Sequence, residues 1–465
     1  MIQKNEHIHF IGIGGYGMSA IARVLLEMGY RVTGSDVSSN KLTEALVEKG
    51  AEIYLGHDGA LVNHADRVVY SSSIPEHNVE RKAAREQGIP VYHRSQMLAL
   101  LLNDKKGVAV AGAHGKTTTS SMIAQTMEEG AVDPSYIIGG EVVSLGSNAK
   151  AGSSDWVVAE ADESDGTFLE YFPHIAVVTN IEPDHLENYE GDFENLKQAY
   201  RQFLHQVKTD GVAVLGWDDA YVREIASDCN ARVVTYALDC PADVTATDIR
   251  QHLNTLTFTV HAYGKELGEM TIHVPGRHNV ANALATTAVC LEAGMPFSAI
   301  AEGMVRFRGA KRRFQVIGEE DDILVVDDYA HHPTEIRATL NGLKAMNRRI
   351  LAVFQPQRYS RTHLLMEEFS HAFAEADQLV ISSIYSPPGE PPIDGVSSER
   401  LVEMVRQNSN PYAQFRDTKE EVEEWLLEQA RPGDLVITMG AGDIWRVAHN
   451  LVPALQKRRK KANLT

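Results

Sequence analysis

The sequence predicts an α/β protein of three domains, each built on a largely parallel sheet. Short apolar strands that end at glycine or polar residues and lead into helices recur along the chain, a rhythm typical of parallel sheets with crossover helices. With 465 residues, the chain is also too long for one ordinary core. We expect domains at residues 1–104, 105–312 and 313–465.

The first domain opens with a strand, a glycine turn and a helix. We expect the strand at Ile8–Ile11, the helix at Ser19–Met28 and the next strand at Arg31–Thr33. The turn, Gly12–Gly17, has the G-x-G-x-x-G spacing of a Rossmann-like dinucleotide fingerprint, and Asp36 lies where an acid would bind a ribose. Alone, this pattern fits both an NAD site and a tight turn without a ligand.

A second anion-binding signal occurs in the same domain. Ser71 and Ser72 directly follow the strand Val68–Tyr70, so they fall at another carboxyl strand end. Together with Gly14 and Gly15 of the fingerprint, these serines could hold one diphosphate ligand.

The central domain opens with the sharpest motif, a phosphate loop. A buried strand, Val108–Ala111, leads into glycines and then a helix start, so backbone N–H groups and Lys116 can approach phosphates while Thr117 can ligate Mg²⁺. The loop is a short variant, because Val110 stands where the first glycine of the full pattern would be. Spacing alone supports use of either ATP or GTP, and the loop residues expected to bind the nucleotide are Gly112, Ala113, His114, Gly115, Lys116, Thr117 and Thr118.

Acidic residues follow the next two strands of this domain. Glu160–Asp165 comes after the strand Trp156–Ala159, and Asn180–His185 comes after Ile175–Val178. Both segments fall at the sheet edge formed by the carboxyl ends of the strands. Carboxylate oxygens there suit hard cations, and His185 could ligate a metal. An exposed acidic turn and a structural histidine are the alternatives.

The pattern breaks near Ala310–Arg313, where we place the linker to a third α/β domain. Polar segments lie near strand ends or helix starts at Pro275–Asn282, Asp327–Pro333 and Gln355–Arg361. Taken singly, they could be caps, turns or surface pairs. Arg358 and Arg361, in the last segment, could each clamp a carboxylate or phosphate.

Composition narrows the class of function. A hydrophobic content of 43% is ordinary for a folded chain, and the net charge of −19 argues against general binding to nucleic acid or to anionic membranes. Three irregularly spaced cysteines form no disulfide framework, so we expect a reducing cytoplasm. We also expect no signal peptide and no membrane insertion.

Taken in order along the chain, these motifs resemble those of the Mur ligases, and such an ordered set is far more specific than any one member. The motifs that carry the resemblance are Ile11–Gly15, Gly112–Thr119, Glu160–Asp165, Asn180–His185, Gly276–Asn282, Phe307–Phe314, Asp327–Pro333, Gln355–Arg361 and Gly440–Trp445.

The resemblance implies an ATP-dependent ligase of peptidoglycan precursor synthesis. Such an enzyme would join L-alanine to the lactyl carboxylate of UDP-N-acetylmuramate through an acyl phosphate, releasing ADP and phosphate. The Rossmann-like first domain would bind the UDP part, the central P-loop domain would bind ATP, and the Rossmann-like C-terminal domain would bind the amino acid. The fingerprint would then cradle a diphosphate without NAD.

The resemblance also implies roles for single residues. Lys116 would stabilise the transferring phosphate, Thr117 and Glu160 would hold one Mg²⁺, and His185 would hold another. The remaining implied ligand contacts are Asn279, Asn282 and Arg313 with ATP, and Tyr329, His331, Arg358 and Arg361 with L-alanine and the acyl phosphate. Of these, His331 is counted with Lys116, Glu160 and His185 as catalytic.

Two positions depart from the family pattern. Ala113 replaces a common threonine in the loop, which removes a hydroxyl but keeps the backbone cradle. Tyr200 stands near the position where several relatives carry a carbamylated lysine, and Lys197 is out of register, so we predict no carbamate.

Three alternatives remain open at this stage. A sister ligase of the same fold would attach a ready-made tripeptide to the same sugar nucleotide in wall recycling. A nicotinamide dehydrogenase would use the fingerprint but leaves the phosphate loop unexplained. A nucleotide-binding regulator without turnover would not need the acidic residues near Lys116.

Overall fold

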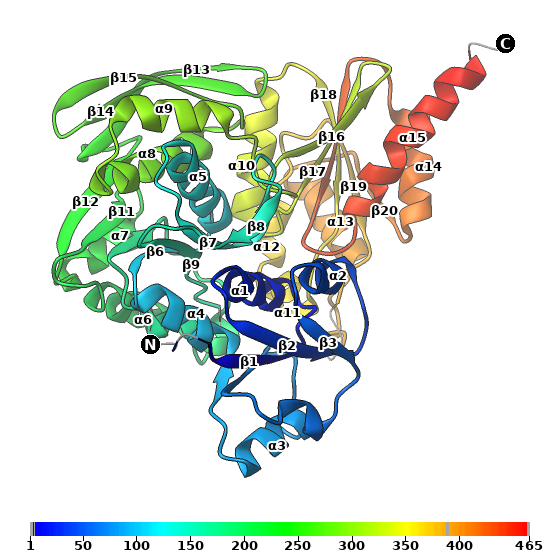
Figure 1. The fold of residues 1–465 in the computed structure, drawn as a ribbon. Helices are drawn as coiled ribbons and strands as arrows, with labels where there is room; N and C mark the ends of the chain where they lie inside the picture. Colours follow the sequence, from blue (N-terminus) through cyan, green and yellow to red (C-terminus); the bar gives the residue numbers. More distant parts are fainter. Residues whose placement is uncertain (1–2, 4, 165, 387–389, 463–465) are drawn as a thin grey trace. The chain divides into compact units, whose positions relative to one another are not determined.

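The computed structural model describes residues 3, 5–164, 166–386 and 390–462, and this part of the chain forms three sheets (Figure 1). The predicted α/β class with three sheet-based domains is confirmed. The chain forms two compact units, one of residues 1–249, 258–271 and 281–308 and the other of residues 250–257, 272–280 and 309–465. The predicted domain limits stay predictions.

The first sheet has five parallel strands in the order β3-β2-β1-β4-β5. In Figure 1, α1 and α2 lie on one side of this sheet and α3 on the other. Strand order reverses at β1, which is where open α/β sheets bind ligands beyond the carboxyl strand ends. The elements are β1 (His7–Ile11), α1 (Tyr16–Glu27), β2 (Arg31–Asp36), α2 (Lys41–Glu48), β3 (Glu52–Leu55), β4 (Arg67–Tyr70), α3 (Val79–Glu86), β5 (Val91–His93) and α4 (Arg94–Asn103).

The first helix begins earlier than the sequence predicts. We expected it at Ser19, but α1 starts at Tyr16, directly after the fingerprint glycines. Ser19 N–H already donates to the carbonyl of Gly15 at 2.9 Å, so Gly15 caps the helix. Its apolar residues Ile21 and Leu25 are buried, and they belong to a core that also contains Ile137 and Ala149 of the second sheet.

The second sheet has ten strands in the order β15-β14-β13-β12-β11-β10-β6-β9-β7-β8. The phosphate-loop strand β6 lies between β10 and β9, which carry the two acidic segments at their carboxyl ends. The elements are β6 (Lys106–Ala111), α5 (Lys116–Glu129), β7 (Ser135–Val142), β8 (Ser147–Lys150), β9 (Trp156–Glu160), β10 (Ile175–Val178), α6 (Phe193–His205), β11 (Val212–Gly216), α7 (Ala220–Ile225), β12 (Arg232–Ala237), β13 (Val244–His252), β14 (Thr255–Ala262), β15 (Lys265–Ile272), α8 (Arg277–Glu292) and α9 (Phe297–Arg306).

The third sheet has six strands in the order β16-β17-β21-β18-β19-β20, and β16 is its antiparallel edge. The polar segments at Asp327–Pro333 and Gln355–Arg361 begin at the carboxyl ends of β17 and β18, which both pair with β21. The elements are β16 (Gln315–Glu320), β17 (Ile323–Asp328), α10 (Pro333–Lys344), β18 (Arg349–Phe354), α11 (Tyr359–Leu364), α12 (Met366–Ser370), β19 (Gln378–Ser382), α13 (Ser398–Asn408), β20 (Ala413–Arg416), α14 (Lys419–Gln429), β21 (Asp434–Met439) and α15 (Trp445–Ala462).

Within the described ranges, no helix is both long and apolar enough to cross a membrane.

Candidate active site

The phosphate loop is shaped by two glycines with left-handed backbone. Gly112 has φ +132° and Gly115 has φ +86°, and α5 starts immediately afterwards at Lys116. Asn180, from the loop after β10, holds the turn: its carbonyl accepts Ala113 N–H at 3.0 Å and its side-chain oxygen accepts His114 N–H at 2.8 Å. The loop is therefore preformed at the N-terminus of a helix, an arrangement that favours bound phosphate.

Gly112→Ala should destabilise the protein and weaken ATP binding. A Cβ on residue 112 would overlap the hydroxyl of Thr179 and would lie 3.0 Å from its backbone nitrogen, on a backbone that already disfavours side chains. Strain of this kind costs about 1–3 kcal/mol before the overlap is counted. The matched control is Gly50→Ala, which has φ +102° but open space around the new Cβ. Thermal unfolding should show a larger loss for Gly112→Ala; equal losses would contradict the overlap.

Lys116 is held at the base of this loop by a buried carboxylate. Its Nζ donates to the carbonyl of Gly112 at 2.6 Å and to both oxygens of Glu163 at 2.8 and 2.9 Å. Burial favours the neutral amine, but the charges of Glu163, Asp162 and Glu160 prevail and raise the pKa of Lys116. The ammonium is therefore charged and pre-positioned. In the sequence, Glu163 is one of several acidic residues in a run, and we assigned it no role of its own. Its spacing from Lys116 did not indicate that the two side chains form an ion pair.

Glu160 and Thr117 supply oxygen ligands beside the loop. Thr117 Oγ1 lies 3.2 Å from Glu160 Oε2, and Glu160 Oε1 accepts Gly139 N–H at 2.7 Å. A hydroxyl and a carboxylate this close are hard donors that suit Mg²⁺ together with phosphate oxygens. The structure brings these two predicted ligands together, as expected for strands β6 and β9 that lie side by side.

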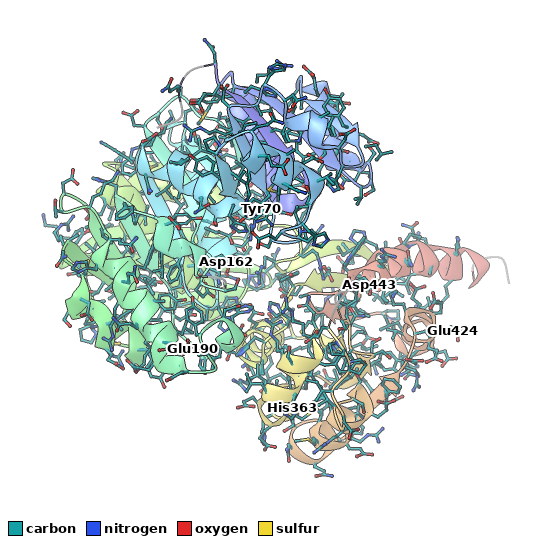
Figure 2. All side chains as sticks on the ribbon, turned by 90° about the horizontal axis from the view of Figure 1, so that it is seen from below. Tyr70, Asp162, Glu190, His363, Glu424 and Asp443 are labelled. Atoms are coloured by element: carbon teal, nitrogen blue, oxygen red, sulfur yellow. The ribbon has the colours of Figure 1, made fainter. Side chains whose placement is uncertain are left out.

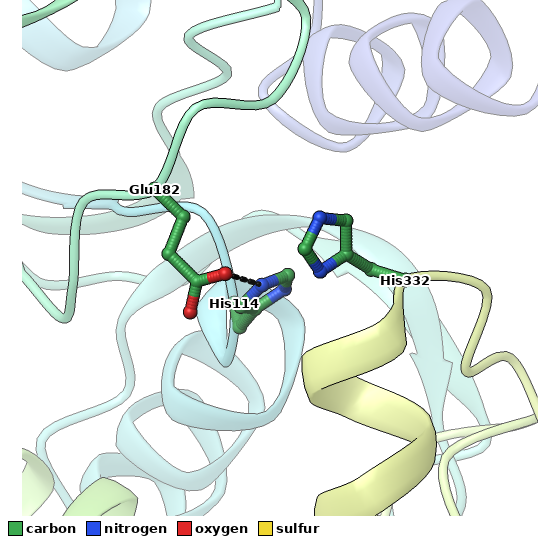
Figure 3. Close-up of side chains that lie close together, drawn as sticks. All are labelled: His114, Glu182 and His332. Carbon is green, nitrogen blue, oxygen red and sulfur yellow. Dashed lines mark ion pairs between the residues drawn. The ribbon is translucent and has the colours of Figure 1, made fainter. Parts of the chain in front are cut away.

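The loop after β10 places His185 near the same carboxylates. Burial opposes ionisation of Asp162, labelled in Figure 2, but the charge of Lys116 and hydrogen bonds from Ser164 lower its pKa, with a smaller contribution from His185. His185 itself has φ +55°, and its Nε2 lies 3.6 Å from Asp184. His114 Nε2 lies 3.3 Å from a carboxylate oxygen of Glu182, as Figure 3 shows.

The fingerprint of the first domain also forms a compact site. Asp36 Oδ2 accepts Gly14 N–H at 2.8 Å, so one oxygen of the expected ribose contact is used to hold the glycine loop. A Cβ on Gly12 would lie 3.2 Å from the hydroxyl of Ser71, which places the serine loop beside the fingerprint. Ser72 Oγ lies 3.0 Å from His93 Nε2.

Tyr16, within the fingerprint, interacts with the carboxylates of Glu141 and Glu160. Burial, together with the charges of Glu141 and Glu160, raises the pKa of this phenol to about 12. The first residue of α1 thus lies within electrostatic range of a predicted Mg²⁺ ligand. The two loops belong to one compact unit.

In the third domain, aromatic and cationic groups gather after β17. The Arg312 and Arg313 guanidinium carbons lie 5.0 and 5.1 Å from the centre of the Tyr329 ring, and the ring of His331 meets Tyr329 edge-on at 5.2 Å. Glu335 pairs with Arg313 at 3.5 Å and accepts His331 N–H at 3.0 Å. Three predicted site residues, Arg313, Tyr329 and His331, are therefore brought together.

Asp328 lies under this group and should make stability depend on pH. Burial raises its pKa from 3.8 to about 6, although Arg313 and two backbone N–H groups oppose the shift. Because the folded-state pKa is the higher one, the penalty is absent below about pH 4 and grows to roughly 3 kcal/mol as pH rises through 6. Unfolding free energies at pH 4 to 7 should show the wild type losing stability relative to Asp328→Asn. As a control, the unfolding free energy of Asp321→Asn, at an exposed residue, should change with pH as that of the wild type does. The same pH dependence in Asp328→Asn and the wild type would contradict the raised pKa of Asp328.

The other predicted contacts lie in or next to helices α8 and α11. Asn282 Oδ1 accepts the hydroxyl of Thr119 at 3.2 Å, so it lies beside the phosphate-loop helix, whereas Asn279 donates to the carbonyl of Pro275 at 2.7 Å. Arg358 precedes α11 with φ +68°, and Arg361, within α11, is 8% exposed. Their roles stay predictions.

Known protein families and sequences match nearly the whole chain. The model of the Mur ligase family, catalytic domain, matches residues 7–106; the Mur ligase middle domain matches 110–290; and the Mur ligase, glutamate ligase domain, matches 312–442. The UDP-N-acetylmuramate–L-alanine ligase of Symbiobacterium thermophilum is 50% identical over 98% of this chain and 96% of its own length.

A second relative and a solved structure are also similar to this chain. The ligase of the same name from Geotalea uraniireducens is 48% identical, with 98% of this chain and 99% of that one covered. The crystal structure of UDP-N-acetylmuramate–alanine ligase from Thermotoga maritima has 28% identity and a TM-score of 0.79, covering 97% of this chain and 99% of that one. Because three domain models of the family match most of the chain and relatives at 50% and 48% identity cover 98% of it, the chain belongs to the Mur ligase family.

Proposed function

We propose that the protein is an ATP-dependent ligase that joins L-alanine to the lactyl carboxylate of UDP-N-acetylmuramate in peptidoglycan precursor synthesis. The observation that carries the proposal is the pairing of a preformed phosphate loop at Lys116 with a second, diphosphate-like loop at Gly12–Gly17 in one compact unit. Relatives at 50% and 48% identity carry the name of this activity.

The chemistry follows from the poor reactivity of a carboxylate. The lactyl carboxylate attacks the γ-phosphorus of ATP, which gives an acyl phosphate and ADP. The amine of L-alanine then adds to the acyl carbon, and the tetrahedral intermediate expels inorganic phosphate. Lys116, fixed by Glu163, is placed to neutralise charge on the transferring phosphoryl group.

Thr117 and Glu160 would hold Mg²⁺, and His185 would hold a second ion; when bound, the metal neutralises phosphate charge. Asn279, Asn282 and Arg313 would contact the nucleotide. In the third domain, Tyr329, His331, Arg358 and Arg361 would bind the amino acid and the acyl phosphate. These groups suit the task because a guanidinium pairs with carboxylate and phosphate oxygens. The protein would work in the cytoplasm, because all three substrates are small and water-soluble.

An ATP-dependent phosphate-release assay with UDP-N-acetylmuramate and a panel of amino acids tests the proposal. Release should require ATP, the sugar nucleotide and L-alanine together. The sister activity predicts release with the tripeptide L-Ala-γ-D-Glu-meso-diaminopimelate but not with L-alanine, and that result would replace the proposal by the alternative.

A further inference from the structure

A chain of buried polar side chains crosses the first domain on the α3 side of its sheet. Glu80 and His9 are both 0% exposed, and His9 Nε2 lies 2.7 Å from a Glu80 oxygen. The carboxylate also accepts the Ser35 hydroxyl at 2.9 Å and meets His57 Nδ1 at 2.7 Å. Burial opposes ionisation, but the hydrogen bonds from His9, Ser35 and His57 lower the pKa of Glu80. A charged carboxylate is therefore fixed in the interior.

This carboxylate fixes the orientation and tautomer of His57. A carboxylate only accepts, so the His57 nitrogen that faces it, Nδ1, carries the hydrogen. In the neutral ring Nε2 is then an acceptor. The side chain is 19% exposed, and no hydrogen-bond partner of Nε2 is found among the residues that the structure describes. The network thus presents an aimed acceptor at the surface of the domain.

His57 lies at the ligand edge of the sheet. It follows β3, and the preceding Gly56 N–H donates to the carbonyl of Asp36 at 2.8 Å. Ser35, whose hydroxyl lies 3.1 Å from His57 Nδ1, uses its carbonyl to accept the N–H groups of Gly12 and Ile13 at 2.8 and 3.1 Å. One residue therefore fixes both the fingerprint loop and the imidazole, which ties His57 to the diphosphate-like site.

We propose that Glu80 positions His57 as a hydrogen-bond acceptor for the nucleoside half of the sugar nucleotide. This rests on the proposed function, because it takes the occupant of the first domain to be a uridine diphosphate. Ionised phosphates offer no hydrogen to an acceptor, whereas uridine offers the uracil N3–H and the ribose hydroxyls. We therefore assign the acceptor to the nucleoside and the glycine and serine loops to the diphosphate.

The test is calorimetric binding to the full-length protein of UDP, of 3-methyluridine diphosphate, which lacks the N3–H, and of 2′-deoxyuridine and 3′-deoxyuridine diphosphates. In the wild type, one analogue should bind about tenfold more weakly than UDP, the size of one hydrogen bond. In His57→Ala, UDP should lose about the same factor, and that analogue should then bind as well as UDP. ATP affinity should not change.

Controls separate this role from a structural one. His64→Asn changes an exposed histidine of the same domain whose left-handed backbone, at φ +69°, suits asparagine. It should bind UDP as the wild type does. Glu80→Gln should weaken UDP binding with ATP affinity kept, and adding it to His57→Ala should cost little more.

The proposal is overturned if wild type binds all three analogues as tightly as UDP, a result that does not depend on any variant folding. It is also overturned if folded His57→Ala keeps the analogue discrimination. If the wild type binds no UDP at all, the proposed function fails instead, so the two failures are distinguishable.

Discussion

Lys116→Ala should reduce turnover by about 10²–10³-fold or more, the cost of removing one group that stabilises transition-state charge. In the structure the ammonium of Lys116 lies 2.8 Å from a Glu163 oxygen and 2.6 Å from the carbonyl of Gly112. These contacts hold the positive charge in place before ATP binds. Phosphate release under saturating substrates measures the loss. Binding of UDP-N-acetylmuramate should persist, because the hydrogen bonds of Lys116 go to Gly112, Ala113 and Glu163 and not to the fingerprint loop.

The substitution also leaves Glu163 buried without its partner, which could lower activity through folding alone. The double variant Lys116→Ala/Glu163→Gln removes that carboxylate charge and should recover thermal stability but not turnover. Lys82→Ala, at a lysine side chain that is 73% exposed, is the matched control and should be fully active. Recovery of turnover in the double variant would show that Lys116 acts on the fold and not on the reaction.

Glu160→Gln should raise the Mg²⁺ concentration needed for half-maximal activity by at least about 10- to 100-fold, the range seen when even a supporting contact of a metal site is lost. An amide keeps the shape but removes the charge that a hard divalent ion prefers. The glutamine can still meet Thr117, so the local fold should survive. Titration of MgCl₂ in the phosphate-release assay measures the shift.

Glu170→Gln is the control for this variant, because Glu170 is an exposed acid of the same domain. Its Mg²⁺ dependence should equal that of the wild type. An unchanged Mg²⁺ dependence in Glu160→Gln, with only kcat reduced, would assign Glu160 to a role other than metal binding.

Much of the fold and part of the site could be predicted from the sequence, because both follow from strand ends. Parallel strands bring their carboxyl ends to one edge, so the loops after β6, β9 and β10 had to meet once these strands were neighbours. That reasoning placed acidic residues at the sheet edge beside the phosphate loop, and the family resemblance paired Thr117 with Glu160, whose oxygens lie 3.2 Å apart in the structure. The family resemblance is confirmed as well.

Other features depend on side-chain geometry that spacing does not encode. Glu160 ends β9 and Glu163 follows it in the same acidic run, and only the direction of each side chain decides that Glu163 meets Lys116. The Glu80–His9 pair joins residues 71 positions apart, on a helix and a strand that no motif connects. The β13–β15 extension of the second sheet was also missed, because strands with alternating burial such as β14 resemble many surface hairpins.

The packing of α1 on the second sheet limits how the enzyme can be divided. Ile21 shares its core with Ile137 and Ala149, and Arg23 donates to the hydroxyl of Ser147 at 2.6 Å. A fragment ending at residue 104 would expose the apolar face of α1 to water and lose solubility, and a fragment starting at residue 105 would expose the apolar residues that pack against α1. A chimera of two homologues should therefore take both packing surfaces from the same parent, whether it arises in nature or in the laboratory.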